Sequence, residues 1–353
     1  MPVAGIECNI ISTSDSNHLS QIYTGFKQLQ SEGRIRLSQS FHDRSAASDE
    51  NTAPHKLLVL INGRRVLYDM SDGGGIHKEA IERIDFCFKR SFSKERVKAL
   101  GVEAKVFPLG LNYAVAPDRV DFFGFRRALR HAKGIHRVTG ALYALKCYRS
   151  SKHLRVNQLQ APPNFEAPAR IIFLTTTYDP GRSKTDQKKK ETDHINRTRA
   201  ECIRALRREF GDRFLGGISF NAGIKKGYED CLIPDKAFTR RDNYIRILKH
   251  YPICVATTGL HGSIGWKFGE YVALSKAILS EKLLYAAPGL QPGKNFLEFA
   301  TPAQCVEEAQ RLMTDRDLRA QIMLNNAYYY MEYLKPDVMI MKSILTALAR
   351  SCA

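Results

Sequence analysis

The feature that most constrains the fold is an alternation of short apolar runs with longer stretches of helical periodicity, which starts twice along the chain. The first series begins with the apolar run 6–11 and the second with the run 170–175. A segment with three prolines and little periodicity, 157–168, separates the two series. Because strands that alternate with helices form parallel, doubly wound sheets, the pattern predicts an α/β protein with two Rossmann-like lobes.

The proline-containing segment sets the domain boundaries that we expect. The N-terminal lobe covers 1–160 and the C-terminal lobe covers 168–335, since a chain of 353 residues favours two domains over one. The strands predicted for the first lobe are 6–11, 57–61, 66–68, 84–88 and 105–107. The strands predicted for the second lobe are 170–175, 214–219, 253–256, 277–280 and 295–299. Helices are expected between the strands, and an apolar helix over 338–349 closes the chain.

Three short segments refine this outline. Asn62-Gly63, between two apolar runs, is typical of a tight hairpin turn. The highly charged segment 181–194 predicts a mobile loop, followed by a helix from about 196 to 210. Asp315-Arg316-Asp317 lies between two helical patterns, which predicts a loop or a helix cap rather than a metal site.

The net charge of +18 predicts attraction to polyanions such as nucleic acid, an anionic lipid surface or a phosphorylated substrate. Ten basic residues and one acid, Asp121, lie within 119–155, interleaved with phenylalanine, tyrosine and leucine. Three interpretations fit this stretch: a solvated helical face, a basic and aromatic surface that lies on an anionic membrane, or a nucleic-acid contact. Nucleic acid is the least favoured partner, because the sequence contains no dedicated nucleic-acid-binding motif.

Cysteine usage and the N-terminus indicate the compartment. The eight cysteines and ten histidines are scattered, without a CxxC pair or a close Cys/His cluster. This predicts neither a disulfide framework nor a zinc site. The chain starts without a secretory signal pattern, and no apolar run is long enough to cross a membrane. We expect a cytoplasmic protein without a metal or cofactor; if the stretch 119–155 binds lipid, the protein is peripheral on the inner face of the membrane.

The segment 254–281, CVATTGLHGSIGWKFGEYVALSKAILSE, contains the clearest chemical pattern. An apolar strand ends in TTG, the loop LHGSIG follows, and a helix leads into the next strand. A glycine- and serine-containing loop that enters a helix offers phosphate groups both backbone N–H donors and the positive end of the helix. Lys267 adds a charge, and Glu270 can accept hydrogen bonds from two vicinal ribose hydroxyls. The alternative is that Lys267 and Glu270 are surface residues of an ordinary amphipathic helix.

Residues 269–278, GEYVALSKAI, resemble the donor-binding motif of GT-B glycosyltransferases, in which a helix with a glutamate leads through small residues into an apolar strand. The resemblance implies that Glu270 binds the ribose of a nucleoside-diphosphate sugar and that the amides of 262–264 face the diphosphate. It also implies two lobes that face each other across a cleft, with helix 336–353 crossing back onto the acceptor-binding first lobe. Retaining members often carry an earlier glutamate where Gly262 stands here, so inversion and retention both stay open.

Further donor contacts are expected where the first strand of the second lobe ends. Ligands of parallel sheets bind beyond the carboxyl ends of the strands, and this strand runs into three threonines, 175–177. Arg199 offers an always charged, bidentate partner for phosphate, or else forms a surface ion pair. The residues predicted to bind the donor are Thr176, Thr177, Arg199, Thr258, Gly259, Gly262, Ser263, Ile264, Gly265, Lys267 and Glu270.

Two pairs of charged residues follow strands of the first lobe and are the predicted catalytic residues. Asp69 and Asp72 offer a general base for an acceptor hydroxyl, with an Asx turn as the alternative. Lys89 and Arg90 offer a site for an acceptor phosphate or for the leaving diphosphate. Asn112 follows the next predicted strand and is a weaker candidate for the same region.

The function that these patterns favour is a metal-independent glycosyltransferase. It moves a sugar from a nucleoside-diphosphate sugar to a hydroxyl of a glycan, a lipid-linked glycan or a polysaccharide. Two alternatives stay open: a basic nucleic-acid-binding protein, and a non-catalytic protein that binds a sugar nucleotide or assembles with partner transferases.

Overall fold

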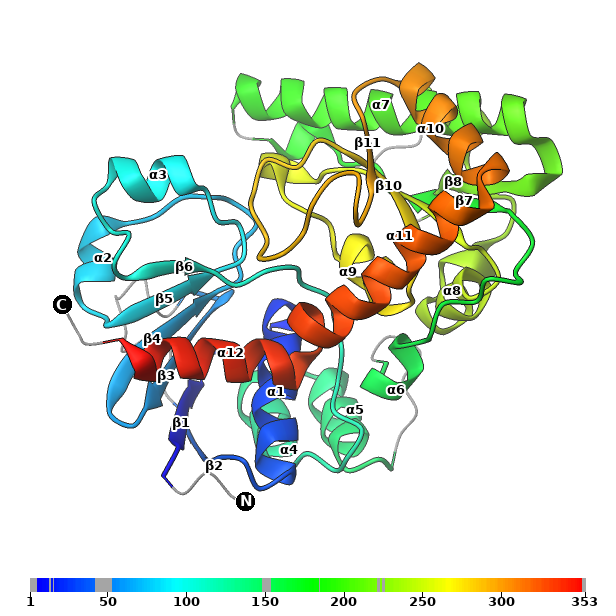
Figure 1. Cartoon of the computed structure of the whole chain (residues 1–353). Helices are drawn as coiled ribbons and strands as arrows, with labels where there is room; N and C mark the ends of the chain where they lie inside the picture. Colours follow the sequence, from blue (N-terminus) through cyan, green and yellow to red (C-terminus); the bar gives the residue numbers. More distant parts are fainter. Residues whose placement is uncertain are drawn as a thin grey trace. The chain divides into compact units, whose positions relative to one another are not determined.

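The computed structural model describes residues 5–12, 14, 16–41, 53–147, 154–183, 185–220, 223 and 226–350, so 148–153 of the basic stretch lie outside the described residues. The chain divides into two compact units. Unit 1 comprises Met1–Gln158, Tyr285–Pro288 and Met331–Ala353, and unit 2 comprises Leu159–Leu284 and Gly289–Tyr330. Each unit has its own sheet (Figure 1), which confirms the α/β class and the two-lobe organisation.

In the described residues, unit 1 has a six-stranded sheet in the order β2-β1-β3-β4-β5-β6. Its strands are β1 (Glu7–Ser12), β2 (Arg36–Phe41), β3 (Lys56–Ile61), β4 (Arg64–Asp69), β5 (Phe86–Lys89) and β6 (Val106–Pro108). Its helices are α1 (Ser20–Ser31), α2 (Lys78–Glu82), α3 (Lys94–Ala99), α4 (Phe122–His131), α5 (Ile135–Ala144) and α12 (Pro336–Ala349). The short helix α6 (Val156–Leu159) lies at the boundary of the two units.

One strand of this sheet, β3, runs antiparallel to its neighbours β1 and β4, whereas the other pairs are parallel. The reversal follows from Asn62-Gly63, whose φ angles of 47° and 82° suit a two-residue turn between antiparallel strands. The predicted hairpin is confirmed, and the sheet is mostly rather than wholly parallel. Because β3 runs backwards, its first residues lie at the edge where β1 and β4 end.

Helices cover both faces of the unit 1 sheet, because successive side chains of a strand point to opposite faces. Val66 and Tyr68 of β4 belong to a core with residues of α1 and α12, whereas Leu67 packs with residues of α2 and α3. The helix α12 lies against α1 (Figure 1). The Tyr68 and Ser343 hydroxyls, 2.7 Å apart, join β4 to α12. The last helix of the chain is therefore part of the core of unit 1.

In the described residues, unit 2 has five parallel strands in the order β11-β10-β9-β7-β8. Its strands are β7 (Ile171–Thr175), β8 (Phe214–Ile218), β9 (Ile253–Ala256), β10 (Ala277–Glu281) and β11 (Leu297–Phe299). Its helices are α7 (Asp186–Phe210), α8 (Arg241–Leu248), α9 (Trp266–Ala273), α10 (Pro302–Thr314) and α11 (Arg316–Tyr329). The chain passes from β7 to β8 on one side and then returns to β9 on the other side of β7. This crossover places β7 and β9 next to each other.

The prediction of a loop over 181–194 is wrong from Asp186 onward, because α7 begins there. The side chain of Thr185 caps the helix by accepting a hydrogen bond from the amide of Lys188. Lys189 and Asp186, one turn apart, form an ion pair at 3.2 Å. Lysine, glutamine and glutamate are good helix formers, so a charged sequence with a threonine cap can form a helix as readily as a loop.

Two smaller expectations can be compared with the structure. The Asp315 carboxylate accepts a hydrogen bond from the amide of Leu318 at 2.9 Å, so the predicted helix cap is confirmed. Within the part of the chain that the structure describes, none of the helices combines the length and the apolar composition that crossing a membrane requires.

Candidate functional site

The crossover between β7 and β9 marks the place in unit 2 where a ligand is expected. In open parallel sheets, ligands bind beyond the carboxyl ends of the strands at the point where the strand order reverses. A cavity of about 380 Å³ lies there. Thr175 and Thr176 at the end of β7, together with Thr257 and Thr258 after β9, line this cavity. Its volume is within the usual range of small-molecule sites.

The two strand ends are joined by Arg199 of α7, whose side chain is buried. Its Nε donates to the Thr257 hydroxyl at 3.0 Å, and its Nη1 donates to the Thr176 carbonyl at 2.7 Å. Its Nη2 donates to the Thr258 carbonyl at 2.9 Å. All three guanidinium nitrogen atoms therefore bond the two strand ends that line the cavity. Arg199 itself also lines the cavity. The guanidinium positions the two loops and also contributes its permanent charge to the cavity.

The loop after β9 is folded by hydrogen bonds of its own. The amide of Gly259 donates to the Ser263 carbonyl at 2.8 Å, and the amide of Ser263 donates to the Leu260 carbonyl at 3.3 Å. Gly262 has a φ angle of +64°, and a Cβ at this position would lie 2.8 Å from Cδ2 of Leu284. Glycine therefore suits both the backbone and the space. The Ser263 amide thus closes the turn, and the contact of the 262–264 amides with a diphosphate stays a prediction.

Helix α9 begins at the edge of the cavity. Its N-cap residue is Gly265, which has no side chain to bond the amides of the first turn. Gly265, Trp266 and Lys267 all line the cavity. Since the N-terminus of a helix carries partial positive charge and amide donors, an anion in the cavity would meet a favourable partner there.

Lys267 brings a full charge to the same place. Its ammonium donates to the Leu174 carbonyl and lies 5.2 Å from the centre of the Tyr244 ring. Burial lowers the pKa of Lys267 to about 8, Glu270 acts in the opposite direction, and the nearby arginines lower it further. The lysine is therefore partly deprotonated slightly above neutral pH, and a bound anion would favour its charged form.

Glu270 lies in α9 with only 2% of its surface exposed. Its Oε1 lies 2.7 Å from Nη1 of Arg241, the first residue of α8. The charged residues that line the cavity are thus Arg199, Arg241, Lys267 and Glu270, which are three cations and one carboxylate. This excess of positive charge in a cavity suits a ligand with two or more negative charges.

The structure gathers most of the predicted donor residues around the cavity. Those that line it are Thr176, Arg199, Thr258, Ile264, Gly265, Lys267 and Glu270. The predicted residues that are absent from the lining are Thr177, Gly259, Gly262 and Ser263. Thr258 is held by Glu281, which accepts from its amide at 2.7 Å and from its hydroxyl at 3.0 Å. The role of all these residues in donor binding stays a prediction.

Sequence reasoning missed several residues of the cavity. Arg241 and Tyr244 fall in a helix that the periodicity predicts, but no motif distinguishes them from other helical residues. Trp266, the single tryptophan of the chain, directly precedes the predicted Lys267 and is the one residue whose rarity offers a signal. Glu281 is the last residue of the predicted segment, where a strand ends toward the site.

In unit 1 the structure pairs two of the predicted catalytic residues with each other. Asp69 and Lys89 are partners across the adjacent strands β4 and β5, and their charged atoms lie 2.9 Å apart. The side chain of Lys89 is 1% exposed. Burial alone would raise the pKa of Asp69, but Lys89 and hydrogen bonds from Ser71 outweigh it and hold the pKa below its usual value. A buried, paired carboxylate with a low pKa is a weak general base.

The other two predicted residues, Arg90 and Asp72, form a second ion pair at 2.6 Å. Arg90 is buried, and burial lowers the pKa of its guanidinium while Asp72 acts in the opposite direction. The Asp72 side chain is 44% exposed, so it is the one of the four that a ligand can readily reach. The four residues thus form two ion pairs, of which only Asp69–Lys89 is buried on both sides, and their catalytic roles stay predictions.

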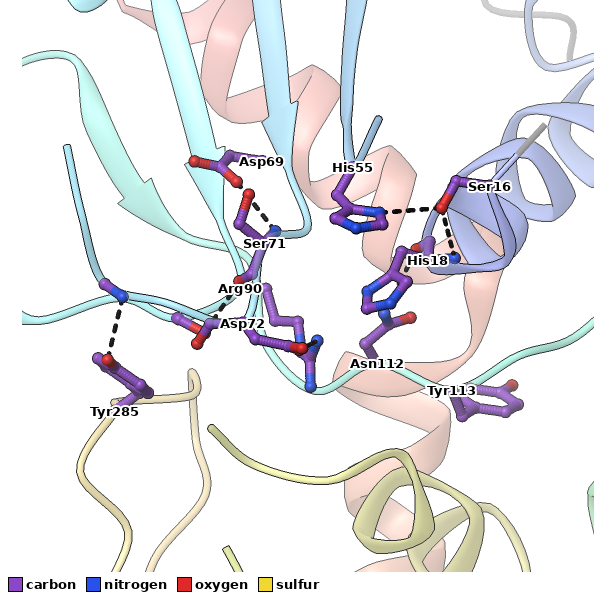
Figure 2. A network of polar contacts seen from close by, with 12 residues as sticks. Ser16, His18, His55, Asp69, Ser71, Asp72, Arg90, Asn112, Tyr113 and Tyr285 are labelled. Carbon is purple, nitrogen blue, oxygen red and sulfur yellow. Dashed lines mark hydrogen bonds and ion pairs between the residues drawn. The ribbon is translucent and has the colours of Figure 1, made fainter. Parts of the chain in front are cut away.

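Two histidines that sequence reasoning missed lie at the same edge of the unit 1 sheet. The ring centres of His18 and His55 are 4.1 Å apart, and the Ser16 hydroxyl is 3.0 Å from Nδ1 of His55. Asn112, the weaker sequence candidate, donates to the His18 carbonyl at 3.3 Å (Figure 2). Burial and His55 lower the pKa of His18, which favours the neutral imidazole at pH 7. His55 reaches this edge because it precedes the reversed strand β3.

Comparisons with known proteins give structural matches only. No protein-family model matches the chain, and a search of curated proteins finds no significant match. TarM of S. aureus matches with a TM-score of 0.42 and 11% identity, over 77% of this chain and 45% of TarM. HepE of Anabaena in complex with UDP-glucose matches with a TM-score of 0.39 and 11% identity, over 98% of this chain and 100% of HepE. The C-terminal domain of LpcC, a glycosyl transferase group 1 family protein of Francisella tularensis, has a TM-score of 0.33 and 15% identity, over 50% of this chain and 95% of that domain.

One of the matched proteins, LpcC, has a glycosyl transferase name, which is the class that the sequence resemblance predicted. The match with TarM spans less than half the length of that protein. Since all three TM-scores are below 0.5, the function has to be inferred from the residues of this chain.

Proposed function

We propose that this protein is a glycosyltransferase that binds a nucleoside-diphosphate sugar in the cavity of unit 2. It transfers the sugar to a hydroxyl of a glycan, a lipid-linked glycan or a polysaccharide that unit 1 binds. The observation that supports this most directly is the charge of the cavity at the β7–β9 crossover. Three cationic side chains and one carboxylate line it, next to the start of α9. That combination suits a diphosphate joined to a ribose.

Each part of the donor has a matching group in the cavity. The diphosphate contacts the first turn of α9 and the ammonium of Lys267. Arg199, which also lines the cavity, adds positive charge. The vicinal hydroxyls of the ribose donate to the carboxylate of Glu270, whose charge Arg241 stabilises. The threonines at the strand ends offer hydroxyl and carbonyl groups for the remaining polar atoms.

The same groups can assist the chemical step. When the bond from the sugar to the diphosphate breaks, positive charge develops on the sugar and negative charge grows on the leaving diphosphate. Lys267 and the amides of α9 stabilise that growing charge, which is the role that a metal ion has in other transferases. Metal independence is therefore part of this proposal. In the described residues, no group of three His, Cys, Asp or Glu side chains is arranged to hold a metal ion.

The acceptor hydroxyl must lose a proton during transfer, and His18 is the base that we propose. A neutral imidazole has a nitrogen lone pair that can accept a proton, whereas the carboxylate of Asp69 is buried and already paired with Lys89. Asp72 is the second choice, because its side chain is partly exposed although Arg90 holds it.

Isothermal titration with nucleoside diphosphates tests the donor site. We expect Glu270→Ala and Glu270→Gln to weaken binding about 10- to 100-fold, since each removes a charged hydrogen-bond acceptor. Glu298→Ala, at an exposed position of β11, is the matched control and should bind like the wild type. Folded wild-type protein that binds no nucleoside diphosphate would overturn the proposal. Sugar transfer from a donor panel to simple acceptors then separates an enzyme from a non-catalytic binding protein.

The charge of +18 favours one competing function, nucleic-acid binding. A gel-shift assay at physiological salt distinguishes the two. Tight, sequence-dependent binding of DNA or RNA would favour the nucleic-acid function, whereas weak binding that disappears with added salt is expected of any strongly basic protein.

A further inference from the structure

The helices α4 and α5 of unit 1 leave an apolar stripe in contact with solvent. On α5, Ile135, Val138 and Leu142 follow the i, i+3, i+7 spacing of one helix face, and they are 68%, 54% and 40% exposed. A helix of a globular protein normally buries such a stripe against the core. Here the buried side of α5 consists of the small residues Ala141 and Ala144 instead.

Helix α4 also has exposed apolar and basic side chains. Phe122 and Leu129 are 64% and 43% exposed, and Arg126 and Arg130 lie on the same side of the helix at i+4 and i+8 from Phe122. The two helices pack against each other. The α4–α5 surface is defined by its exposed large apolar and basic residues, which are Phe122, Arg126, Leu129, Arg130, Lys133, Ile135, Arg137, Val138, Leu142 and Lys146.

The charges of the α4–α5 surface are all of one sign. Its five charged members are arginine or lysine. The single acid between 119 and 155, Asp121, is buried, and its carboxylate accepts a hydrogen bond from the amide of Gly124 at 2.9 Å as the cap of α4. Among the described residues, this surface also holds five of the ten large apolar side chains that are exposed. Apolar and cationic groups are thus concentrated together, without acids.

We propose that the α4–α5 surface binds an anionic phospholipid membrane. The aliphatic and aromatic side chains enter the boundary between headgroups and acyl chains, and the five cations contact the phosphates around them. A second copy of this chain is a poor partner, because it would bring like charges together. Nucleic acid would match the cations but would leave five apolar side chains without a partner.

The inner side of the same two helices agrees with an anionic partner. A cavity of about 760 Å³ lies between α1 and the α4–α5 pair. Its lining includes Arg127, His131, Lys133 and His136, and the acid in it is the capping residue Asp121. Lys133 and Ile135 of the α4–α5 surface also line this cavity, so the basic character of the surface continues into the cavity.

Vesicle co-sedimentation with the full chain tests this proposal without depending on donor binding or transfer activity. One set of vesicles contains phosphatidylcholine alone, and the other contains about 30% phosphatidylglycerol as well. We expect binding to the second set and little binding to the first. Arg126→Gln/Arg130→Gln should weaken binding about 25-fold, at about fivefold for each charge. Ile135→Asp/Val138→Asp should weaken it more than about tenfold.

Matched controls use exposed residues elsewhere. Lys188→Gln/Lys190→Gln removes two exposed charges at the start of α7, and Leu345→Asp changes an apolar side chain of α12 that is 53% exposed. Both controls should bind vesicles like the wild type, and thermal melting should confirm that all variants are folded. Equal binding to both vesicle sets, or equal losses in the controls, would overturn the proposal. The proposal would also be overturned if Ile135→Asp/Val138→Asp changed the oligomeric state but not vesicle binding. In that case the α4–α5 surface would bind protein.

Discussion

The ends of the strands differ between the two units in how their charges are balanced. In unit 1, each predicted cation has its own carboxylate: Lys89 pairs with Asp69, and Arg90 pairs with Asp72. In unit 2, three cations line one cavity together with a single carboxylate, that of Glu270, which pairs with Arg241. A closed ion pair mainly serves the fold, whereas an excess of one charge in a cavity is open to a ligand. The difference supports the proposal that the anionic donor binds in unit 2.

The largest expected effect tests the closed pair of unit 1. Lys89→Met leaves the Asp69 carboxylate buried without its counter-ion, which should lower the free energy of unfolding by about 3–5 kcal/mol. Urea denaturation measures this change. The double variant Lys89→Met/Asp69→Leu should recover most of the loss, and Lys98→Met at an exposed position of α3 should change little. A stable Lys89→Met protein that binds donor but transfers no sugar would show instead that Lys89 is catalytic.

The second prediction concerns the open charge of unit 2. Lys267→Met should weaken nucleoside-diphosphate binding about 10- to 100-fold, because a charged hydrogen bond to phosphate is lost. Its stability should not fall, since the ammonium is desolvated in the folded state. Calorimetric titration and thermal melting measure the two quantities. The control is Lys294→Met, an exposed position of unit 2. Lower stability with unchanged affinity would mean that Lys267 supports the fold, as Lys89 does.

The third prediction concerns the loop that leads into α9. Gly262→Ala places a Cβ at a positive φ angle and against Leu284, which should cost about 1–2 kcal/mol of stability and reduce donor affinity severalfold. Gly293→Ala is a matched control, because Gly293 has a φ angle of +76° but open space around its Cβ position. It should lose some stability and keep its affinity. Equal affinities in both variants would exclude this loop from the donor site.

The smallest effect is a dependence on pH. Because the pKa of Lys267 is about 8 in the folded protein, its charged fraction falls as the pH rises beyond that value. If the charged form binds the diphosphate, affinity should fall about fivefold from about pH 8 to about pH 9. Stability should change in the opposite direction: the unfolded lysine keeps its proton up to its ordinary pKa of 10.5, so the contribution of this group rises with pH between about 8 and 10.5. Titration calorimetry measures the affinity at each pH. The Lys267→Met variant is the reference and should not show this loss of affinity.

The sequence is most informative where the groups of a site lie close together in the chain. The strand β9, the glycine-containing loop and α9 follow one another between residues 253 and 273, so their order alone predicts a phosphate-binding arrangement. The alternation of strands and helices predicts parallel sheets whose strand ends lie at one edge, whereas the crossover that places β7 beside β9 is known from the structure. The loop-helix arrangement and the parallel sheets could therefore be predicted.

Pairings between distant residues could not be predicted in the same way. Asp69 and Lys89 meet because β4 and β5 are paired in a particular register, and periodicity does not specify register. Arg241 and Glu270 meet because α8 and α9 lie next to the same cavity. His55 joins His18 only because β3 is reversed by the turn at Asn62-Gly63. In each case the individual elements are visible in the sequence, while the contact depends on how they assemble.

The place of α12 in the core of unit 1 has a consequence for synthesis. The side-chain amide of Gln21 in α1 donates to the carbonyl of Leu334, just before α12, across 313 positions of the chain. At a translation rate of about 5–20 residues per second, α1 emerges roughly 15 to 60 seconds before this partner. Nearly all of unit 2 is made in that interval and can fold first. The side of α1 around Gly25, which packs against Pro336 and Ile340 of α12, lacks this partner in the meantime.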